Sequence, residues 1–215
     1  MIDTIFWDND GVLVDTEDLY FRATQEAMRK VGFDLTKQLY VEYFLLQGTG
    51  AWHLVDLSKA EIETLRQGRN ERYGELLHAE ARTIDGIQET LDALKPDYQM
   101  GVVTSSRPDH FEIIHKSTGL LPYFDFIITS ADVSETKPSP APYLKALELA
   151  GRAPGDCVVI EDSQRGLLAA HAAGIPCYVI PTETTRASDF SLADGVLQSA
   201  RELPERLGRI IATDG

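Results

Sequence analysis

Apolar and polar positions along most of the chain follow two alternating patterns, short continuous apolar runs and longer segments with apolar residues at helical spacing. Runs of strand length bounded by turn residues predict five β-strands, at residues 4–7, 99–104, 124–129, 157–160 and 176–180. Helical periodicity between them predicts helices at residues 87–94, at 107–118, within 138–150 and at 163–173. Strands separated by helices form parallel sheets that are covered on both faces. We therefore expect an α/β fold.

Residues 15–83 interrupt this alternation, because they contain only helical signals. An acidic helix start at residues 15–18 leads into an apolar stripe that ends at Gly32. Residues 58–61 then open a long helix in capping-box form. We interpret this block as a helical cap domain (residues 15–83) inserted into a Rossmann-like parallel-sheet core domain (residues 1–14 and 84–215).

The 215-residue chain is strongly acidic, with 34 Asp and Glu against 20 Lys and Arg and a net charge of −14. This charge repels phosphate backbones and anionic membrane surfaces, so neither nucleic acid nor a membrane is an expected partner. It also means that an anionic substrate needs a local cation, whether a metal ion, a lysine or an arginine.

The first residues, the apolar runs and the cysteines together indicate the expected cellular compartment. The first residues enter a strand directly, without a charged-then-apolar leader, and no apolar run approaches the length of a membrane span. Cys157 and Cys177 each begin an apolar strand-like run, which favours buried thiols over a disulfide or a redox pair. We therefore expect a cytoplasmic protein.

Polar clusters stand at or just beyond the carboxyl ends of the predicted strands. They are Asp8 with Asp10, Thr104 with Ser105, Lys137, and Glu161 with Asp162. Because parallel strands share their carboxyl edge, the clusters should converge on one site. Each cluster alone has an ordinary structural explanation, as a polar turn, a helix cap or a loop lysine. Four such clusters in order at one edge of a sheet are not explained in this way. Together they predict a site for a hard divalent cation beside an amine that neutralises phosphate.

The four clusters resemble the motifs of the haloacid dehalogenase-like (HAD) superfamily over essentially the whole chain. They read DNDGVLVDTE at residues 8–17, Thr104, KPSP at residues 137–140 and IEDSQRG at residues 160–166. The helical insertion after the first motif resembles the subfamily with a small helical cap, which includes β-phosphoglucomutase and phosphoglycolate phosphatase. The resemblance implies a phosphoryl-transfer enzyme whose partner is a small phosphorylated metabolite, and we expect a monomer or weak dimer.

The resemblance also implies separate roles for the two aspartates of the first motif. Asp8 is expected to attack phosphorus and form an aspartyl-phosphate. Asp10 is expected to protonate the leaving oxygen and then to deprotonate the hydrolytic water. Mg²⁺ is the expected cofactor, held by the Asp8 and Asp162 carboxylates and the backbone carbonyl of Asp10, with Glu161 or water completing the shell.

The remaining motif residues are implied to contact the phosphoryl group. Thr104 and the neighbouring Ser105 and Ser106 are expected to hold its oxygens, and Lys137 to offset charge between nucleophile and phosphate. In the cap, His53 and Arg72 are the expected contacts to the rest of the substrate. Other cap candidates are Trp52, Arg69 and Tyr73, and packing or solvation is the alternative explanation for each of the five.

Asp10 favours phosphate esters, because a halide leaving group needs no proton and dehalogenases of this fold lack that carboxylate. The first alternative is β-phosphoglucomutase-type phosphoryl transfer between sugar positions. Three departures weigh against it: Tyr20 in place of the mutase's cap histidine, a loop at residues 48–53 without arginine, and Pro108 in place of an asparagine. The second alternative is a non-catalytic binding module, which the intact motif set disfavours. We therefore expect a Mg²⁺-dependent phosphatase.

Overall fold

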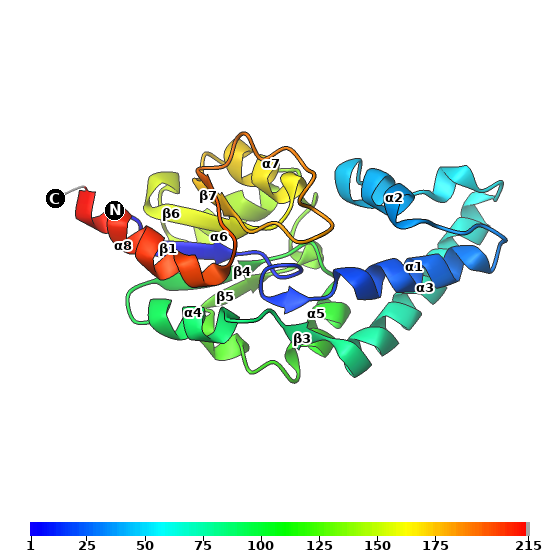
Figure 1. Ribbon diagram of the computed structural model, residues 1–215, viewed down its shortest axis with the longest axis horizontal. Coiled ribbons are helices and arrows are strands. Elements are labelled where there is room, and N and C mark those ends of the chain that lie inside the picture. Colours follow the sequence, from blue (N-terminus) through cyan, green and yellow to red (C-terminus); the bar gives the residue numbers. More distant parts are fainter. Residues whose placement is uncertain (214–215) are drawn as a thin grey trace. The chain divides into compact units, whose positions relative to one another are not determined.

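The computed structural model describes residues 1–213, and the side chains of residues 1–208. The chain divides into two compact units (Figure 1). We call the first, Met1–Asp15 with Thr83–Gly215, the core unit, and the second, Thr16–Arg82, the helical unit. The short strands β2 (Val14–Asp15) and β3 (Arg82–Thr83) lie where the chain passes between them.

The core unit contains a six-stranded sheet in the order β5-β4-β1-β6-β7-β8, and all of its strand pairs are parallel. The strands are β1 (Thr4–Trp7), β4 (Gln99–Val103), β5 (Phe126–Ile128), β6 (Cys157–Glu161), β7 (Cys177–Val179) and β8 (Gly195–Val196). The expected α/β fold with a parallel sheet is confirmed. Strand β8 was not predicted, because this two-residue edge strand carries no apolar run.

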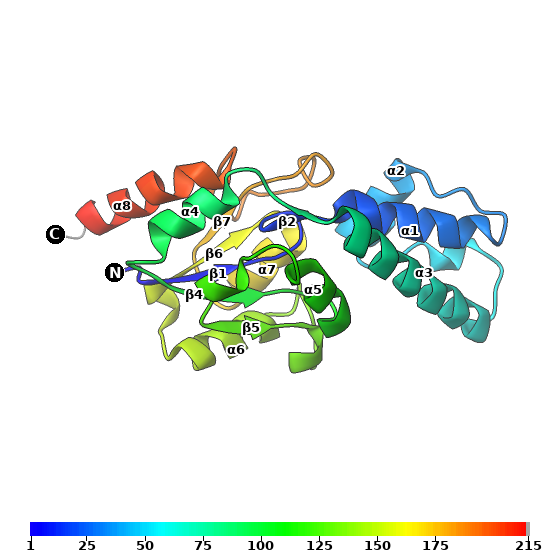
Figure 2. The ribbon, with the colours of Figure 1, turned by 90° about the horizontal axis from the view of Figure 1, so that it is seen from below.

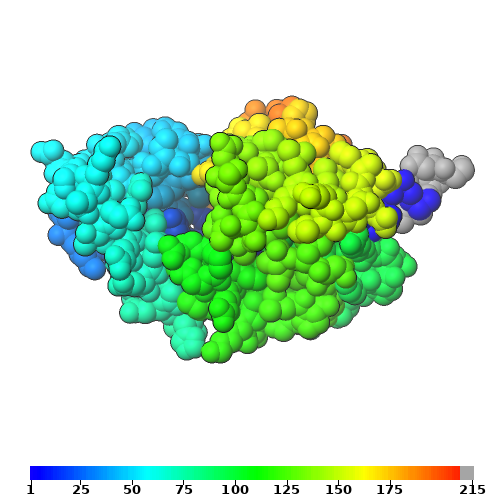
Figure 3. Space-filling view, turned by 180° about the vertical axis from the view of Figure 1, so that it is seen from behind, coloured from blue at the N-terminus to red at the C-terminus, as the bar shows by residue number. Residues whose placement is uncertain are grey.

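Helices cover both faces of the sheet. They are α4 (Ile87–Leu94), α5 (Pro108–His115), α6 (Ala141–Ala150), α7 (Gln164–Ala172) and α8 (Leu203–Thr213). The side chains of α6 and α7 join one apolar cluster with the strands, while α4 and α8 pack together on the other side of the sheet from α6 (Figure 2). The outer side of α6 is part of the surface in Figure 3. Leu144 and Leu149 of this helix are exposed. Helix α8 was not expected from the sequence.

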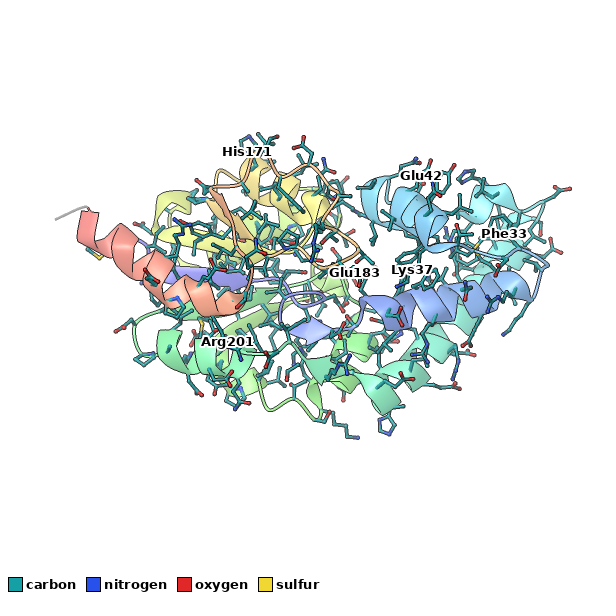
Figure 4. All side chains as sticks on the ribbon, in the orientation of Figure 1. Phe33, Lys37, Glu42, His171, Glu183 and Arg201 are labelled. Atoms are coloured by element: carbon teal, nitrogen blue, oxygen red, sulfur yellow. The ribbon has the colours of Figure 1, made fainter. Side chains whose placement is uncertain are left out.

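Arg201 fixes the C-terminal segment of the core unit to the start of α4. It lies in the 3-10 turn Ala200–Glu202 (Figure 4). It donates to the two carboxylate oxygens of Asp85 at 2.9 and 3.2 Å. Its guanidinium covers Gly86, where a Cβ atom would lie 2.5 Å from it. Gly86 also has φ +79°, a conformation that favours glycine, so both space and backbone require this residue.

The helical unit is built from α1 (Glu17–Arg29), α2 (Lys37–Tyr40) and α3 (Lys59–Glu80). A π-helical turn (Val41–Leu46) and a 3-10 turn (Trp52–Leu54) connect α2 to α3. The expected capping box is present, because Ser58 Oγ accepts from the Glu61 backbone N–H while Glu61 accepts from that of Ser58. Helix α1 packs against α3 around an aromatic core that includes Phe21, Tyr40 and Trp52.

Two expectations about the chain as a whole concern cysteines and membranes. Cys157 and Cys177 are buried free thiols, as expected. Among residues 1–213, none of the helices has both the length and the apolar character needed to cross a bilayer.

Candidate active site

The carboxyl edge of the central strands brings together residues that are far apart in sequence. Asp8 follows β1 directly, and its backbone N–H donates to the carbonyl of Ile160 in β6 at 2.9 Å. Glu161 ends β6 and Asp162 follows it, while Thr104 follows β4. Since β4 and β6 flank β1, these polar residues emerge side by side.

Lys137 enters this cluster from the loop after β5, and its side chain is buried. Its ammonium group donates to Asp8 Oδ1 at 2.7 Å, to Glu161 Oε1 at 2.6 Å and to the carbonyl of Val103 at 2.7 Å. All three donors of the ammonium therefore have partners. The Arg165 side chain in turn donates to the Lys137 carbonyl, which ties this loop to α7.

Glu161 is fully buried and both of its carboxylate oxygens accept several hydrogen bonds. Oε1 accepts from Lys137 and from the Tyr143 hydroxyl at 2.8 Å. Oε2 accepts from the backbone N–H of Asp162 and from the Ser163 hydroxyl, at 3.2 and 3.0 Å. The carboxylate lies directly against Gly166, where a Cβ atom would collide with it. Glu161 is therefore a rigid anchor for Lys137.

Asp8, Glu161 and Asp162 form a buried acidic group whose ligand atoms lie within 4.8 Å of one another. Gly11 has φ +84°, and a Cβ atom there would lie 2.5 Å from Asp162 Oδ2, so the glycine allows this close approach. The group has three carboxylates, and the one ammonium of Lys137 pairs with two of them, Asp8 and Glu161. This excess of negative charge, presented by oxygen atoms alone, fits a hard divalent cation.

Burial and charge shift the pKa values at this edge. Desolvation, helped by the negative charge of Glu161 and opposed by Lys137, raises the pKa of Asp8 to about 8. Burial alone would lower the pKa of Lys137, but the charges of Asp8 and Glu161 outweigh it and the pKa is raised. We therefore take Lys137 as charged, and Asp8 as the group whose ionisation needs further positive charge.

Asp10 is half-buried and its Oδ2 accepts from three side chains. The donors are Ser106 Oγ at 2.6 Å, Asn9 Nδ2 at 3.2 Å and Thr104 Oγ1 at 3.4 Å. Thr104 Oγ1 also accepts from the Ser106 backbone N–H at 3.0 Å. Asp10, Thr104 and Ser106 thus form one hydrogen-bonded group, while the neighbouring Ser105 is exposed.

The two cap residues expected to bind substrate lie in the helical unit. His53 is exposed and its ring packs edge-on against Tyr43, with 4.9 Å between centroids. Arg72 donates to Glu26 at 2.7 Å and to Glu75 at 2.8 Å, so two carboxylates already balance its charge.

Sequence reasoning missed Tyr143 and His115, which support the site from α6 and α5. Both lie on apolar helix faces, so their periodicity is that of core residues. Only the neighbouring groups identify them: Tyr143 donates to Glu161, and His115 Nε2 lies 2.8 Å from Asn9 Oδ1.

Residues 5–180 match the family model described as haloacid dehalogenase-like hydrolase, a span that includes all four strand-end clusters. The chain belongs to this family of hydrolases, as its motifs indicated. Its relatives within the family further identify it as a phosphatase.

Three relatives illustrate the similarity. Protein CbbY of Rhodobacter capsulatus is 30% identical over 204 residues, which cover 88% of this chain and 90% of CbbY. Phosphoglycolate phosphatase of Thiobacillus denitrificans is 36% identical over 110 residues, 51% of this chain and 48% of that enzyme. The crystal structure of a CbbY variant from Rhodobacter sphaeroides in complex with xylulose-1,5-bisphosphate has 30% identity and a TM-score of 0.82, covering 94% and 96% of the two chains.

Proposed function

We propose that the core unit hydrolyses a small phosphomonoester through an aspartyl-phosphate on Asp8, with Mg²⁺ as cofactor. The observation that carries this proposal is the buried Lys137 ammonium 2.7 Å from Asp8 Oδ1. A fixed cation beside a nucleophilic carboxylate offsets the charge of an incoming phosphoryl group, which would otherwise repel it.

Mg²⁺ would be held by the carboxylates of Asp8 and Asp162 and by the backbone carbonyl of Asp10. The donor set supports this assignment, because it consists of oxygen atoms and carries more negative charge than Lys137 balances. When bound, Mg²⁺ supplies positive charge that offsets these carboxylates and the phosphoryl oxygens. Glu161 is the less suitable ligand, since its oxygens already accept hydrogen bonds from Lys137 and Ser163.

In the first step, a carboxylate oxygen of Asp8 attacks phosphorus. The bond from phosphorus to the ester oxygen breaks, and Asp10, carrying a proton in the substrate complex, donates it to the departing oxygen. The products are the free alcohol, an aspartyl-phosphate on Asp8 and an ionised Asp10. Splitting hydrolysis in this way gives two easier steps.

In the second step, Asp10 takes a proton from a water molecule as the water oxygen attacks phosphorus. The bond between phosphorus and Asp8 breaks, inorganic phosphate leaves, and both aspartates return to their starting states. Thr104, Ser105 and Ser106 would donate to the phosphoryl oxygens in both steps, and losing one such contact typically costs about 3–4 kcal/mol.

The substrate is proposed to be a small phosphorylated metabolite such as a sugar phosphate or phosphoglycolate. Support comes from the relatives: one structure holds xylulose-1,5-bisphosphate, and another relative is a phosphoglycolate phosphatase. The net charge of −14 disfavours nucleic acid as a substrate. His53 and one of the two cap arginines, Arg69 or Arg72, are proposed to contact the part of the substrate beyond the phosphate.

The test is phosphate release from p-nitrophenyl phosphate with and without Mg²⁺. We expect turnover with Mg²⁺ in the wild type, and loss of at least about 10³-fold in Asp8→Asn, in which the nucleophile is removed. Asp3→Asn is the matched control, because Asp3 lies in the same unit but pairs with Arg152 away from the site. Equal turnover in wild type and Asp8→Asn would refute the proposal.

The same assay separates the mutase alternative and narrows the substrate. With β-glucose 1-phosphate, a phosphatase releases free phosphate, whereas a mutase forms glucose 6-phosphate. A screen of sugar phosphates, phosphoglycolate and nucleoside monophosphates then ranks the substrates by kcat/KM.

A further inference from the structure

A line of buried polar side chains leads from α5 to Asp10. Asn9 stands between the two aspartates and is fully buried. Its Oδ1 lies 2.8 Å from His115 Nε2, and its Nδ2 donates to Asp10 Oδ2 at 3.2 Å. On the other side of the imidazole, Nδ1 lies 2.9 Å from Thr118 Oγ1.

The surroundings fix both ends of this line. Thr118 Oγ1 accepts from the Leu120 backbone N–H at 3.3 Å, and the His115 ring packs against Phe111 with 4.3 Å between centroids. The Asn9 backbone carbonyl accepts from the N–H groups of Leu13 and Val14 at 2.9 and 3.1 Å. Asn9 is therefore held through both its backbone and its side chain.

The hydrogen bonds of this line have one consistent direction. Burial lowers the pKa of His115 to about 4, so at neutral pH one ring nitrogen donates and the other accepts. The carboxylate of Asp10 accepts from the Asn9 amide nitrogen, which leaves the Asn9 oxygen to accept from His115 Nε2. His115 Nδ1 then accepts from the Thr118 hydroxyl.

This direction has a consequence for Asp10. Oδ2 is an acceptor towards Asn9, and towards Ser106 as well. An acidic proton on Asp10 therefore belongs on Oδ1. Thr104 and Ser106 are also proposed to donate to the phosphoryl group, and a hydroxyl that turns to substrate no longer restrains Asp10. The Asn9 amide is buried and keeps its bond.

We propose that Asn9, His115 and Thr118 form a positioning chain that holds the Asp10 carboxyl group for proton transfer to the leaving oxygen. The inference rests on the proposed function and extends it to residues that do not touch substrate. None of the three is a catalytic residue, because each acts through its neighbour in the chain.

The test compares two esters that differ in their need for an acid. The leaving oxygen of glycerol 2-phosphate needs a proton, whereas that of 2,4-dinitrophenyl phosphate leaves as a stable anion. The parameter is kcat/KM, which reports the step that forms the aspartyl-phosphate. In Asn9→Leu and His115→Phe we expect a loss of about tenfold or more for glycerol 2-phosphate, a part of the 10²–10⁴-fold that general acid help supplies. For the dinitrophenyl ester we expect less than about threefold.

Three further variants separate positioning from stability. Asn9→Leu combined with His115→Phe removes both buried polar partners, so neither is left unsatisfied and the melting temperature should recover towards wild type. The selective loss on glycerol 2-phosphate should persist in this double variant. Thr118→Val should show a smaller selective loss, and Thr118→Ser, which keeps the hydroxyl, should restore wild-type values.

Ile114→Val is the matched control, since Ile114 is a buried residue of the same helix and belongs to no part of the chain of hydrogen bonds. It should lower the melting temperature without changing the ratio of the two kcat/KM values. If the Asn9 and His115 variants lose both activities equally, or lose neither, the positioning chain is refuted while the proposed function stands. If the wild type with Mg²⁺ hydrolyses neither ester, both are refuted.

Discussion

The Lys137 ammonium lies 2.6 Å from Glu161 Oε1, a carboxylate that is itself inaccessible to solvent. Glu161 also accepts from Tyr143 and Ser163, so its position does not depend on a bound ion. A buried charge held this firmly by protein groups serves as an anchor for its partner. We therefore propose that Glu161 positions Lys137 beside Asp8.

This anchor function predicts different metal affinities in two variants of neighbouring residues. Asp162→Asn removes a proposed ligand, and we expect the affinity for Mg²⁺ to fall at least about tenfold. Glu161→Gln keeps the shape of the anchor and should weaken the affinity less than about fivefold, while reducing turnover because Lys137 loses its charged partner. Isothermal titration calorimetry with Mg²⁺ measures the affinity of each variant. A greater loss of affinity in Glu161→Gln than in Asp162→Asn would make Glu161 the ligand.

The pKa of Asp8 predicts how metal binding depends on pH. Because this pKa is raised to about 8, the carboxyl group binds a proton below that pH, and the cation must displace it. The affinity for Mg²⁺ should therefore rise with pH, by up to about tenfold per unit between about pH 6 and pH 8, and then level off. In Asp8→Asn this component should disappear. A wild-type affinity that is constant over this range would contradict the prediction.

The metal-free protein should show the opposite trend in stability. The folded state holds a proton on Asp8 that an unfolded aspartate, with a pKa of about 3.9, releases. The free energy of unfolding should therefore decrease as pH rises from about 4 to 8. Urea melts in the presence of a chelator measure it, and saturating Mg²⁺ should reduce the slope.

The proximity of Asp8, Thr104 and Glu161 could be predicted from the sequence, because residues that follow parallel strands lie at the same edge of the sheet. The prediction holds because β1, β4 and β6 are adjacent parallel strands, whose carboxyl ends meet whatever their separation in the chain. Lys137 was placed by the same reasoning, in the loop after the strand predicted at residues 124–129, but its contacts with Asp8 and Glu161 could not be predicted.

The parts that could not be predicted depend on packing between elements. Tyr143 and His115 have the helical spacing of core residues, and only the tertiary structure shows which polar group each one meets. Strand β8 is held by its edge pairing with β7 rather than by its own apolar content. Arg72 has the sequence context of an exposed cation, and its pairing with Glu26 depends on how α1 packs against α3.

Of the two arginines expected in the cap, Arg69 is better suited than Arg72 to bind a second anionic group of a substrate. Arg69 is 9% exposed, donates to the Tyr20 hydroxyl at 2.5 Å, and lies over the Tyr20 and Trp52 rings. Among the described side chains no carboxylate pairs with it, whereas Arg72 has two such partners. A buried cation without an acidic partner is costly unless a ligand anion uses it.

This difference predicts selective effects on substrate binding. Arg69→Met should raise the KM for phosphoglycolate about 10–100-fold, because a hydrogen bond to a charged group contributes about 1.5–3 kcal/mol. The KM for p-nitrophenyl phosphate should change less than about threefold. Arg69→Lys should restore part of the loss, and Arg72→Met is the control, with little effect on either substrate. If Arg72→Met instead produces the larger change for phosphoglycolate, the original expectation for that residue is correct.

The lowered pKa of His115 predicts a pH dependence of stability whose sign is opposite to that caused by Asp8. Burial lowers its pKa from the ordinary value of 6.5 to about 4, although the nearby charge of Asp10 acts to raise it. The unfolded chain therefore binds a proton between these two values that the folded protein excludes. The neutral imidazole contributes stability that is fully present above about pH 6.5 and is lost as pH falls towards 4, roughly 3 kcal/mol in total.

Urea melts between pH 4 and 7 with saturating Mg²⁺ measure this loss. In His115→Phe the group that binds the proton is absent, so the free energy of unfolding should fall less steeply below pH 6.5, whatever its value at neutral pH. His78→Phe provides a matched control, because His78 lies on the exposed part of α3 and should leave the slope unchanged. If His115→Phe and wild type show parallel curves, His115 titrates equally in the folded and unfolded states, and its ring is not held neutral by burial.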